Sequence, residues 1–197
     1  KGNNNYGKDA SEGGYKAIPA PGVNDSGRTA RVLTGTGPVS WSHDGTLEGI
    51  WDMNGNIWEL NGGVRTVKGE LHVLVNNNAA DLDHSQAASS AQWKAIDATT
   101  GAYITPNGSG TTTNSIKLDW VSGKITYSAT ITTQADASRD CAFASVTCAS
   151  SVSAAAQAVL KALALLPASA TASEYEDDHM WMNNGADERA FFSGGNW

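Results

Sequence analysis

The sequence has no cluster of basic residues, no long apolar run and only two cysteines. Thirteen Lys and Arg residues against twenty Asp and Glu residues give a formal net charge of -7 at pH 7. A negatively charged chain of this kind is poorly suited to bind nucleic acid or an anionic membrane surface. The most apolar stretch, residues 154–166, is too short to span a membrane and is interrupted by Lys161. We therefore expect no nucleic-acid partner and no insertion into a membrane.

The sequence also lacks a recognisable zinc or catalytic motif. No histidine lies at ligand spacing from Cys141 or Cys148. The two cysteines could form a disulfide in an oxidising compartment or remain free thiols elsewhere, and the sequence leaves both open. The four histidines stand in unrelated contexts, and no Ser/His/Asp arrangement can be identified. The first residues contain no apolar signal-peptide core, so the sequence gives no cellular address.

What the sequence does contain indicates a folded, loop-rich protein. A chain of 197 residues is long enough for one sizeable core, or for one domain that carries a large insertion. Twenty-one glycines and a charged fraction of only 17% favour many tight turns. Seven tryptophans require burial, which excludes a disordered chain.

Alternation of apolar and polar residues predicts two β-hairpins. Residues 64–67 and 71–75 flank a turn at 68–70. In the second hairpin, apolar residues alternate over 116–120 and again over 125–131, and Ser122-Gly123 supplies the turn.

Helical spacing predicts one long helix that ends before Pro167. Its apolar stripe is typical of core packing and comprises Val152, Ala156, Val159, Leu160, Leu163 and Leu166. Residues 91–98 are predicted to form a second, short helix that presents Trp93 and Ile96. Trp181, near the end of the chain, is predicted to be a core residue.

The most informative stretch is residues 49–60, Gly-Ile-Trp-Asp-Met-Asn-Gly-Asn-Ile-Trp-Glu-Leu. It places Trp51 and Trp58 on either side of a polar segment. Asn54-Gly55 in this segment is a strong turn signal, since both residue types tolerate positive φ. Large aromatic side chains bury much apolar area, so the stretch is predicted to anchor a core.

Residues 49–60 resemble the Gly-(Leu/Val)-x-Asp-Met-x-Gly-Asn-Val-Trp-Glu-Trp signature of the formylglycine-generating (sulfatase-modifying factor) family. Residues 189–197 resemble the Arg-x-x-x-Arg-Gly-Gly-Ser/Asn-Trp element of the same family. The sequence departs from the family pattern at Leu60, where Trp is usual, and at Ser193, where Arg is usual. The same pair of motifs marks the variable proteins of diversity-generating retroelements of phages and prophages, which share a C-type lectin-like fold with these enzymes.

The resemblance implies an α+β, C-type lectin-like fold. Residues 1–65 would form the first part of this domain, residues 66–174 an insertion of two hairpins and one helix, and residues 175–197 the return into the domain. The resemblance also leads us to expect a fragment that lacks both ends of the lectin fold.

The expected function is binding of a ligand or receptor, as in a phage adhesin or a prophage-encoded surface binder with a variable C-terminal binding face. Asn196 and Trp197 are the candidate ligand-binding residues, and the alternative for Trp197, which its residue type favours, is a place in the scaffold core. The partner would be a host-surface protein or glycan, and the protein would be a homo-oligomer in a virion or at the cell surface. The alternatives are a formylglycine-generating-type oxidase, whose paired cysteines would have to follow Trp197, and a carbohydrate-binding lectin. No Glu-Pro-Asn or Gln-Pro-Asp calcium–sugar motif is present.

The resemblance further implies a structural Ca²⁺ site. The matching positions are Asp52 and Glu59 through their side chains and Gly55 and Ile57 through their backbone carbonyls. All four supply oxygen, as a hard cation requires. The alternative is that Asp52 and Glu59 cap turn N–H groups without a metal ion.

Overall fold

The structure is a computed structural model with mixed α+β architecture, so the predicted α+β class is confirmed. The chain divides into two compact units, Lys1–Asn61 with Phe191–Trp197 and Gly62–Ala190. That the second unit is an insertion into a C-type lectin-like domain stays a prediction. The backbone alone is described at residues 17–18, 31–32, 58–61 and 189–194. Altogether the structure describes residues 17–18, 31–32, 35, 37–51, 58–76, 79, 85–169, 178–186 and 189–194.

In the first unit, a short antiparallel pair joins β1 (Ala17–Ile18) to β2 (Arg31–Val32). The 3-10 helix η1 (Val39–Trp41) follows and buries Trp41, which is 5% exposed. Gly37 has to be a glycine, because a Cβ atom there would lie 1.9 Å from the Trp41 ring. The indole therefore packs directly against the backbone of the loop that precedes η1.

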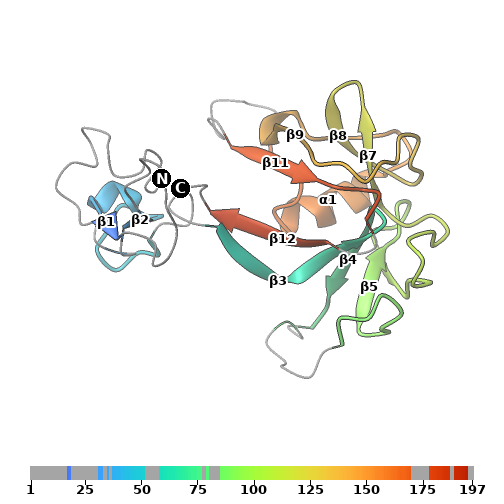
Figure 1. Ribbon diagram of the computed structural model, residues 1–197, viewed down its shortest axis with the longest axis horizontal. Coiled ribbons are helices and arrows are strands. Elements are labelled where there is room, and N and C mark those ends of the chain that lie inside the picture. The colour runs from blue at the N-terminus through green and yellow to red at the C-terminus, as the bar shows by residue number, and fades with distance from the viewer. Residues whose placement is uncertain are drawn as a thin grey trace. The chain divides into compact units, whose positions relative to one another are not determined.

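Most of the strands belong to one large, curled sheet (Figure 1). Among the described residues this sheet has eight strands, six of them in the order β10-β8-β7-β4-β3-β12, while β5 pairs with β4 and β6 pairs with β5. The strands are β3 (Trp58–Val67), β4 (Glu70–Leu74), β5 (Trp93–Ile96), β6 (Tyr103–Ile104), β7 (Lys117–Val121), β8 (Lys124–Ser128), β10 (Thr147–Cys148) and β12 (Arg189–Gly194).

Both predicted hairpins are confirmed. β3 and β4 pair in antiparallel fashion around Lys68-Gly69, whose φ angles are 47° and 85°. β7 and β8 do the same around Ser122-Gly123, with φ angles of 51° and 77°. Positive φ at both central residues is the mark of a type I′ turn, whose twist matches that of the paired strands. The second hairpin is shorter than predicted, because β8 ends at Ser128.

The predicted helix over residues 91–98 is wrong, because this segment forms strand β5. Trp93 pairs with Leu74, and Ala95 pairs with His72 of β4. Trp93, Ala95 and Ile96 are all buried. A spacing of three residues between Trp93 and Ile96 suggests a helix. In the folded protein, however, this segment pairs with one edge of β4, and both side chains become buried. Tertiary pairing has overridden a weak local signal.

The predicted long helix is confirmed as α1 (Ala154–Ala162). The Ser153 side chain caps its N-terminus by accepting a hydrogen bond from the Ala156 N–H. The helix is shorter than the predicted stripe and buries Ala156 and Leu160. It ends before Ala164, whose φ of 56° is left-handed, rather than at Pro167.

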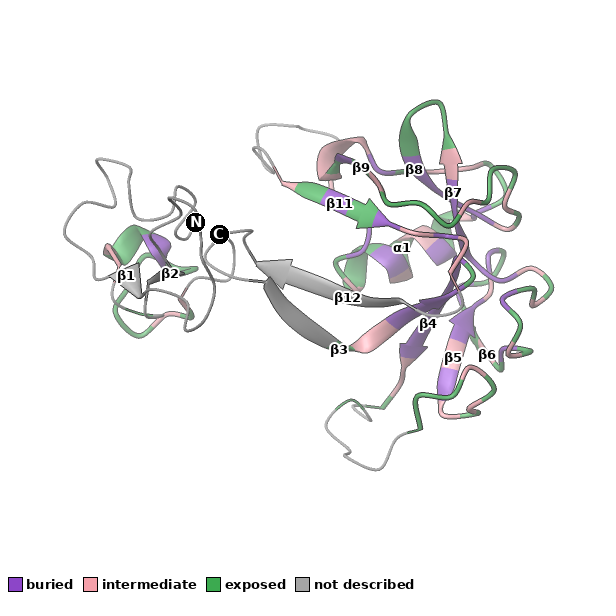
Figure 2. Ribbon diagram, in the orientation of Figure 1, coloured by how far each residue is buried: buried purple, intermediate pink, exposed green. Residues whose placement is uncertain are grey.

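The core lies between one face of the sheet and a second layer made of α1 and an antiparallel pair, β9 (Arg139–Ala142) and β11 (His179–Met182). Tyr127 on β8 marks this face, since its hydroxyl donates to the Leu165 carbonyl just beyond α1 at 2.9 Å. The same hydroxyl lies 3.9 Å from Sδ of Met180 on β11. Figure 2 shows β4 and much of β5 in the colour of buried residues. The fully buried large apolar side chains are Val67, Leu71, Val73, Ile96, Ile116, Leu118, Ile125, Tyr127 and Leu160.

Candidate functional site

The binding and metal residues predicted from the sequence lie almost wholly beyond what the structure describes. Asn196, Trp197, Asp52, Gly55 and Ile57 are outside the described residues. Glu59 is in β3, at a position where the backbone alone is described. The ligand-binding pair and the calcium ligands therefore stay predictions.

Asp140, His179 and Trp181 form a cluster of exposed side chains on the outward face of the β9–β11 pair, here called the tryptophan face. Trp181 is directly opposite Asp140 in the strand register, and His179 is opposite Ala142. Side chains two residues apart on a strand share a face, so these four positions form a small flat patch. Ala142 is exposed and has a small side chain, so no bulky side chain fills the surface at this position opposite His179.

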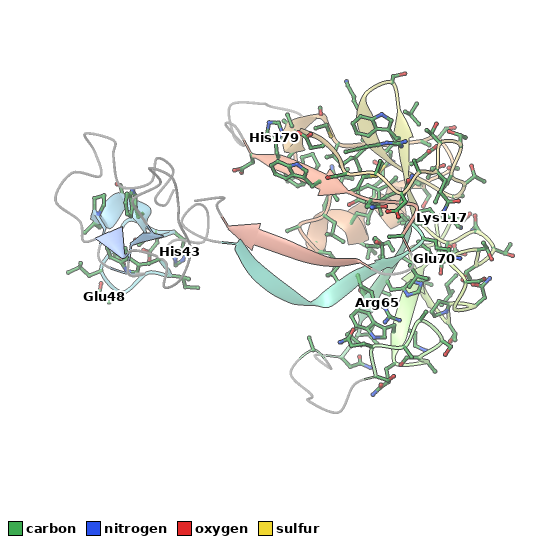
Figure 3. The ribbon with its side chains drawn as sticks, in the orientation of Figure 1. His43, Glu48, Arg65, Glu70, Lys117 and His179 are labelled. Atoms are coloured by element: carbon green, nitrogen blue, oxygen red, sulfur yellow. The ribbon has the colours of Figure 1, made fainter. Side chains whose placement is uncertain are left out.

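The side chains of the tryptophan face contact one another. Nδ1 of His179 lies 2.9 Å from Oδ2 of Asp140. The imidazole and the Trp181 indole are tilted by 34°, with their centroids 5.4 Å apart. Trp181 is 56% exposed, and the side chains of His179 and Asp140 are 39% and 46% exposed. The carboxylate therefore orients the imidazole, and the imidazole supports one side of an open indole. Figure 3 labels His179 at the start of β11.

The prediction that Trp181 is a core residue is wrong, and strand alternation gives the reason. Met180 and Met182, the neighbours of Trp181 on β11, are 9% and 7% exposed and point into the core. On β9, Cys141 does the same, and its Sγ accepts a hydrogen bond from the Ile125 N–H at 3.4 Å. With period-two alternation, Trp181 must then point outward. The sequence His-Met-Trp-Met already contained this signal.

A second group of polar side chains is buried around Glu70, on the face of the eight-stranded sheet opposite to the one that carries Tyr127. The Glu70 side chain is fully buried and accepts hydrogen bonds from His72 Nε2 at 2.8 Å and from Ser115 Oγ at 3.0 Å. The backbone N–H and the hydroxyl of Thr112 donate to it at 2.7 and 2.8 Å. Burial raises the pKa of Glu70, but the hydrogen bonds from His72 and Thr112 outweigh it and hold the pKa below its usual value. Glu70 is therefore an ionised anchor for the loop around Thr112.

Lys117 lies opposite Glu70 in the register and completes this group. Its Nζ donates to Ser115 Oγ at 2.7 Å, so Ser115 bridges the ammonium group and the carboxylate. Burial lowers the pKa of Lys117, and the charge of Glu70 partly opposes that shift. Lys117 also borders an open hollow of about 450 Å³ between residues 110–114 and 129–134. Figure 3 shows Glu70 and Lys117 near each other in the sheet.

Glu70 and His72 are residue types that transfer protons in enzymes, but their placement favours a structural role. Both side chains are 0% exposed, and the carboxylate is occupied by donors from the protein itself. A general base has to come within hydrogen-bond reach of its substrate. No substrate can reach these atoms without opening the sheet, so the pair holds the fold together.

Three other charged side chains hold loops in a similar way. Arg65 donates to the carbonyl groups of Gln86 and Ala87 and stacks on Trp93, with Cζ 4.2 Å from the ring centroid. Asp119 accepts from the N–H groups of residues 132 and 133, both at 2.9 Å. Asp97 accepts from those of residues 99 and 100 at 2.9 and 2.7 Å.

Cys141 and Cys148 are free thiols in the structure. Burial raises the pKa of the Cys148 thiol to about 11, although the nearby charge of Lys161 opposes this. A nucleophilic cysteine requires the opposite shift. The environment of Cys148 therefore suits an unreactive thiol.

Within the described part of the chain, no three His, Cys, Asp or Glu side chains come together as a metal site would require. In that part no helix has the length and apolar character needed to cross a membrane. No protein-family model matches the chain, and a comparison with curated proteins gives no significant match.

Proposed function

We propose that this chain is part of a ligand-binding protein on a C-type lectin-like scaffold, whose second unit is an insertion into that scaffold. The observation that carries the proposal is the pairing of β3 with β12. β3 begins at Trp58, within the motif of residues 49–60, and β12 covers most of the second motif, residues 189–197. A strand that begins within one motif and a strand that covers most of the other are thus neighbours in one sheet, although the motifs lie far apart in the sequence.

This pairing supports an insertion because the chain enters and leaves the second unit by adjacent strands. The unit begins at Gly62 on β3 and ends at Ala190 on β12. An inserted unit whose ends are close together leaves its host fold undisturbed. Buried polar anchors such as Glu70 also hold segments of the second unit together.

Within this class we propose a variable protein of a phage or prophage diversity-generating retroelement. Its receptor would be a host-surface protein or glycan, bound near Asn196, Trp197 and the variable residues expected after them. A rigid scaffold that presents tolerant loops is the usual solution for recognition. The oxidase alternative gains no support from Cys148, whose raised pKa disfavours thiolate chemistry.

Binding of the fluorescently labelled, full-length product to candidate host cells, measured by flow cytometry, tests the proposal. Asn196→Ala should reduce binding at least about tenfold, as loss of a central contact does in other interfaces, with an unchanged melting temperature. Leu47→Ala is the matched control, since Leu47 is 71% exposed in the first unit and should leave binding unchanged. Equal binding by Asn196→Ala and wild type would contradict a C-terminal binding face.

Trp197→Ala distinguishes the two roles open to this residue. Loss of binding at constant melting temperature would place Trp197 in the binding surface. A lower melting temperature with retained binding would place it in the scaffold core, because removing a buried Trp costs about 3–5 kcal/mol.

A further inference from the structure

The tryptophan face has the composition of a ligand site rather than of an ordinary strand surface. Trp181 presents more than half of its surface to solvent, at 56% exposure, from a strand whose neighbouring side chains are anchored in the core. Its orientation is fixed on one side by the His179 ring, at a centroid distance of 5.4 Å. A large aromatic side chain held in this way offers a ligand a flat apolar surface at little cost in conformational entropy.

Polar groups surround this apolar surface, and they have unused hydrogen-bonding capacity. Among the described residues, nothing pairs with the indole N–H of Trp181, with Nε2 of His179 or with Oδ1 of Asp140. The single internal bond joins His179 Nδ1 to Asp140 Oδ2 at 2.9 Å. The face therefore offers one N–H donor, one carboxylate acceptor and one ring nitrogen that can act either way.

Charge narrows the class of ligand. The face carries one carboxylate beside one imidazole, on a chain whose formal net charge is -7. The nearby cation Arg139 is directed elsewhere, since its guanidinium donates to the Thr133 carbonyl and lies 5.6 Å from the Trp120 ring centroid. An anionic ligand such as a phosphate or an acidic sugar would meet the Asp140 carboxylate with no free cation among the described residues of this face to offset it. The described residues of this face therefore disfavour an anionic ligand.

We propose that the tryptophan face binds a neutral saccharide. A pyranose ring stacks its C–H face on the Trp181 indole, while its hydroxyl groups hydrogen-bond to Asp140 and His179. A saccharide combines an apolar ring face with closely spaced donors and acceptors at its rim, which is the combination that this face presents. The small side chain of the exposed Ala142 leaves room for a second sugar ring beside the first, so a chain of sugars fits better than a single one.

Sugars with equatorial hydroxyl groups suit the indole best, since all their axial positions carry hydrogen. β-1,4-linked glucose and β-1,4-linked N-acetylglucosamine meet this requirement. β-1,4-linked mannose does not, because the axial hydroxyl at C2 interrupts one apolar face. The site lies wholly within the second unit and does not depend on the proposed receptor-binding face.

Isothermal titration calorimetry of the whole protein with hexasaccharides of these three sugars tests the proposal. Wild type should bind the glucose or the N-acetylglucosamine hexamer and should bind the mannose hexamer more weakly. Trp181→Ala should lose at least about tenfold in affinity, as truncation of a Trp hot spot does, and Trp181→Phe should recover part of the loss. Asp140→Asn should weaken binding about threefold by replacing a charged acceptor with a neutral one.

Tyr103→Ala is the matched control, because Tyr103 is another exposed aromatic of the second unit, at 48% exposure, on a different strand. It should bind like wild type. Absence of binding to all three sugars, or equal affinity of Trp181→Ala and wild type, would overturn the proposal. Sedimentation equilibrium tests whether a second copy of the chain occupies this face instead. A wild-type dimer that Trp181→Ala abolishes would show that it does, and would also overturn the saccharide proposal.

Discussion

Replacing Glu70 by Gln should destabilise the protein by about 3 kcal/mol. The substitution keeps the size of the side chain and removes its charge. Four hydrogen bonds reach this carboxylate, from His72 Nε2, Ser115 Oγ and both the N–H and the hydroxyl of Thr112. A hydrogen bond to a charged acceptor stabilises the fold by about 1 kcal/mol more than one to a neutral acceptor, so the four bonds together lose ~4 kcal/mol. Removing the buried charge recovers ~1 kcal/mol of this loss, because a neutral amide costs less to bury than a carboxylate.

Urea unfolding followed by tryptophan fluorescence measures this change, and Glu48→Gln is its control. Glu48 is exposed in the first unit, so the same chemical change there should alter stability by less than about 0.5 kcal/mol. A double-mutant cycle with Lys117→Gln adds a sharper test. Because Ser115 bridges Glu70 and Lys117, we expect a coupling energy of at least about 1 kcal/mol. A cost for Glu70→Gln no larger than that for Glu48→Gln, or strictly additive effects with Lys117→Gln, would refute the anchoring role.

The remaining predictions concern acid stability, a second anchor and one thiol. Hydrogen bonds hold the pKa of Glu70 below its ordinary value of 4.5, so its contribution is complete above that pH and disappears as the pH falls through the lower, folded-state value. The unfolding free energy of wild type should therefore drop more steeply below pH 4.5 than that of Glu70→Gln, and parallel curves would contradict this. Asp119→Asn should lower the free energy of unfolding by about 2 kcal/mol, because the Asp119 carboxylate accepts hydrogen bonds from the N–H groups of Thr132 and Thr133. Amide exchange at these two residues should also become faster, and unchanged exchange there would exclude the anchoring role of Asp119. Because the pKa of Cys148 is about 11, roughly one Cys148 thiol in a thousand is ionised at pH 8. In a Cys141→Ser background, iodoacetamide should therefore alkylate Cys148 far more slowly than it alkylates the thiol of glutathione. Alkylation as fast as that of glutathione would show an activated thiol.

The sequence predicted those elements whose causes are local. Both hairpins have turn residues that accept positive φ, as at Ser122-Gly123, and their strands alternate in the expected way. The stripe of α1 at helical spacing predicted the helix, although Ser153 and Ala164 set its ends. Residues 91–98 failed because a short apolar pattern fits either a helix or a strand. The free edge of β4 decided between them, and a partner strand is not a local property.

The polar groups were harder to predict because their partners are distant in the sequence. The local pattern places Glu70 in a turn, yet its partners Thr112 and Ser115 follow more than forty residues later. Only the folded sheet brings them together. Trp181 departs from the prediction for a different reason: tryptophan is usually highly buried, but here the alternation with the buried Met180 and Met182 directs it outward.

The DNA sequence of the locus that encodes this chain distinguishes a binding protein from an enzyme. If this chain is a variable protein, its reading frame continues past Trp197 into an Asn- and Ser-rich stretch that ends near Gly-Phe-Arg. A near-repeat of that stretch and a reverse transcriptase gene should lie close by. A reading frame that instead continues into two cysteines at the positions of the oxidase family, with no reverse transcriptase gene nearby, would contradict the binding function and favour an enzyme.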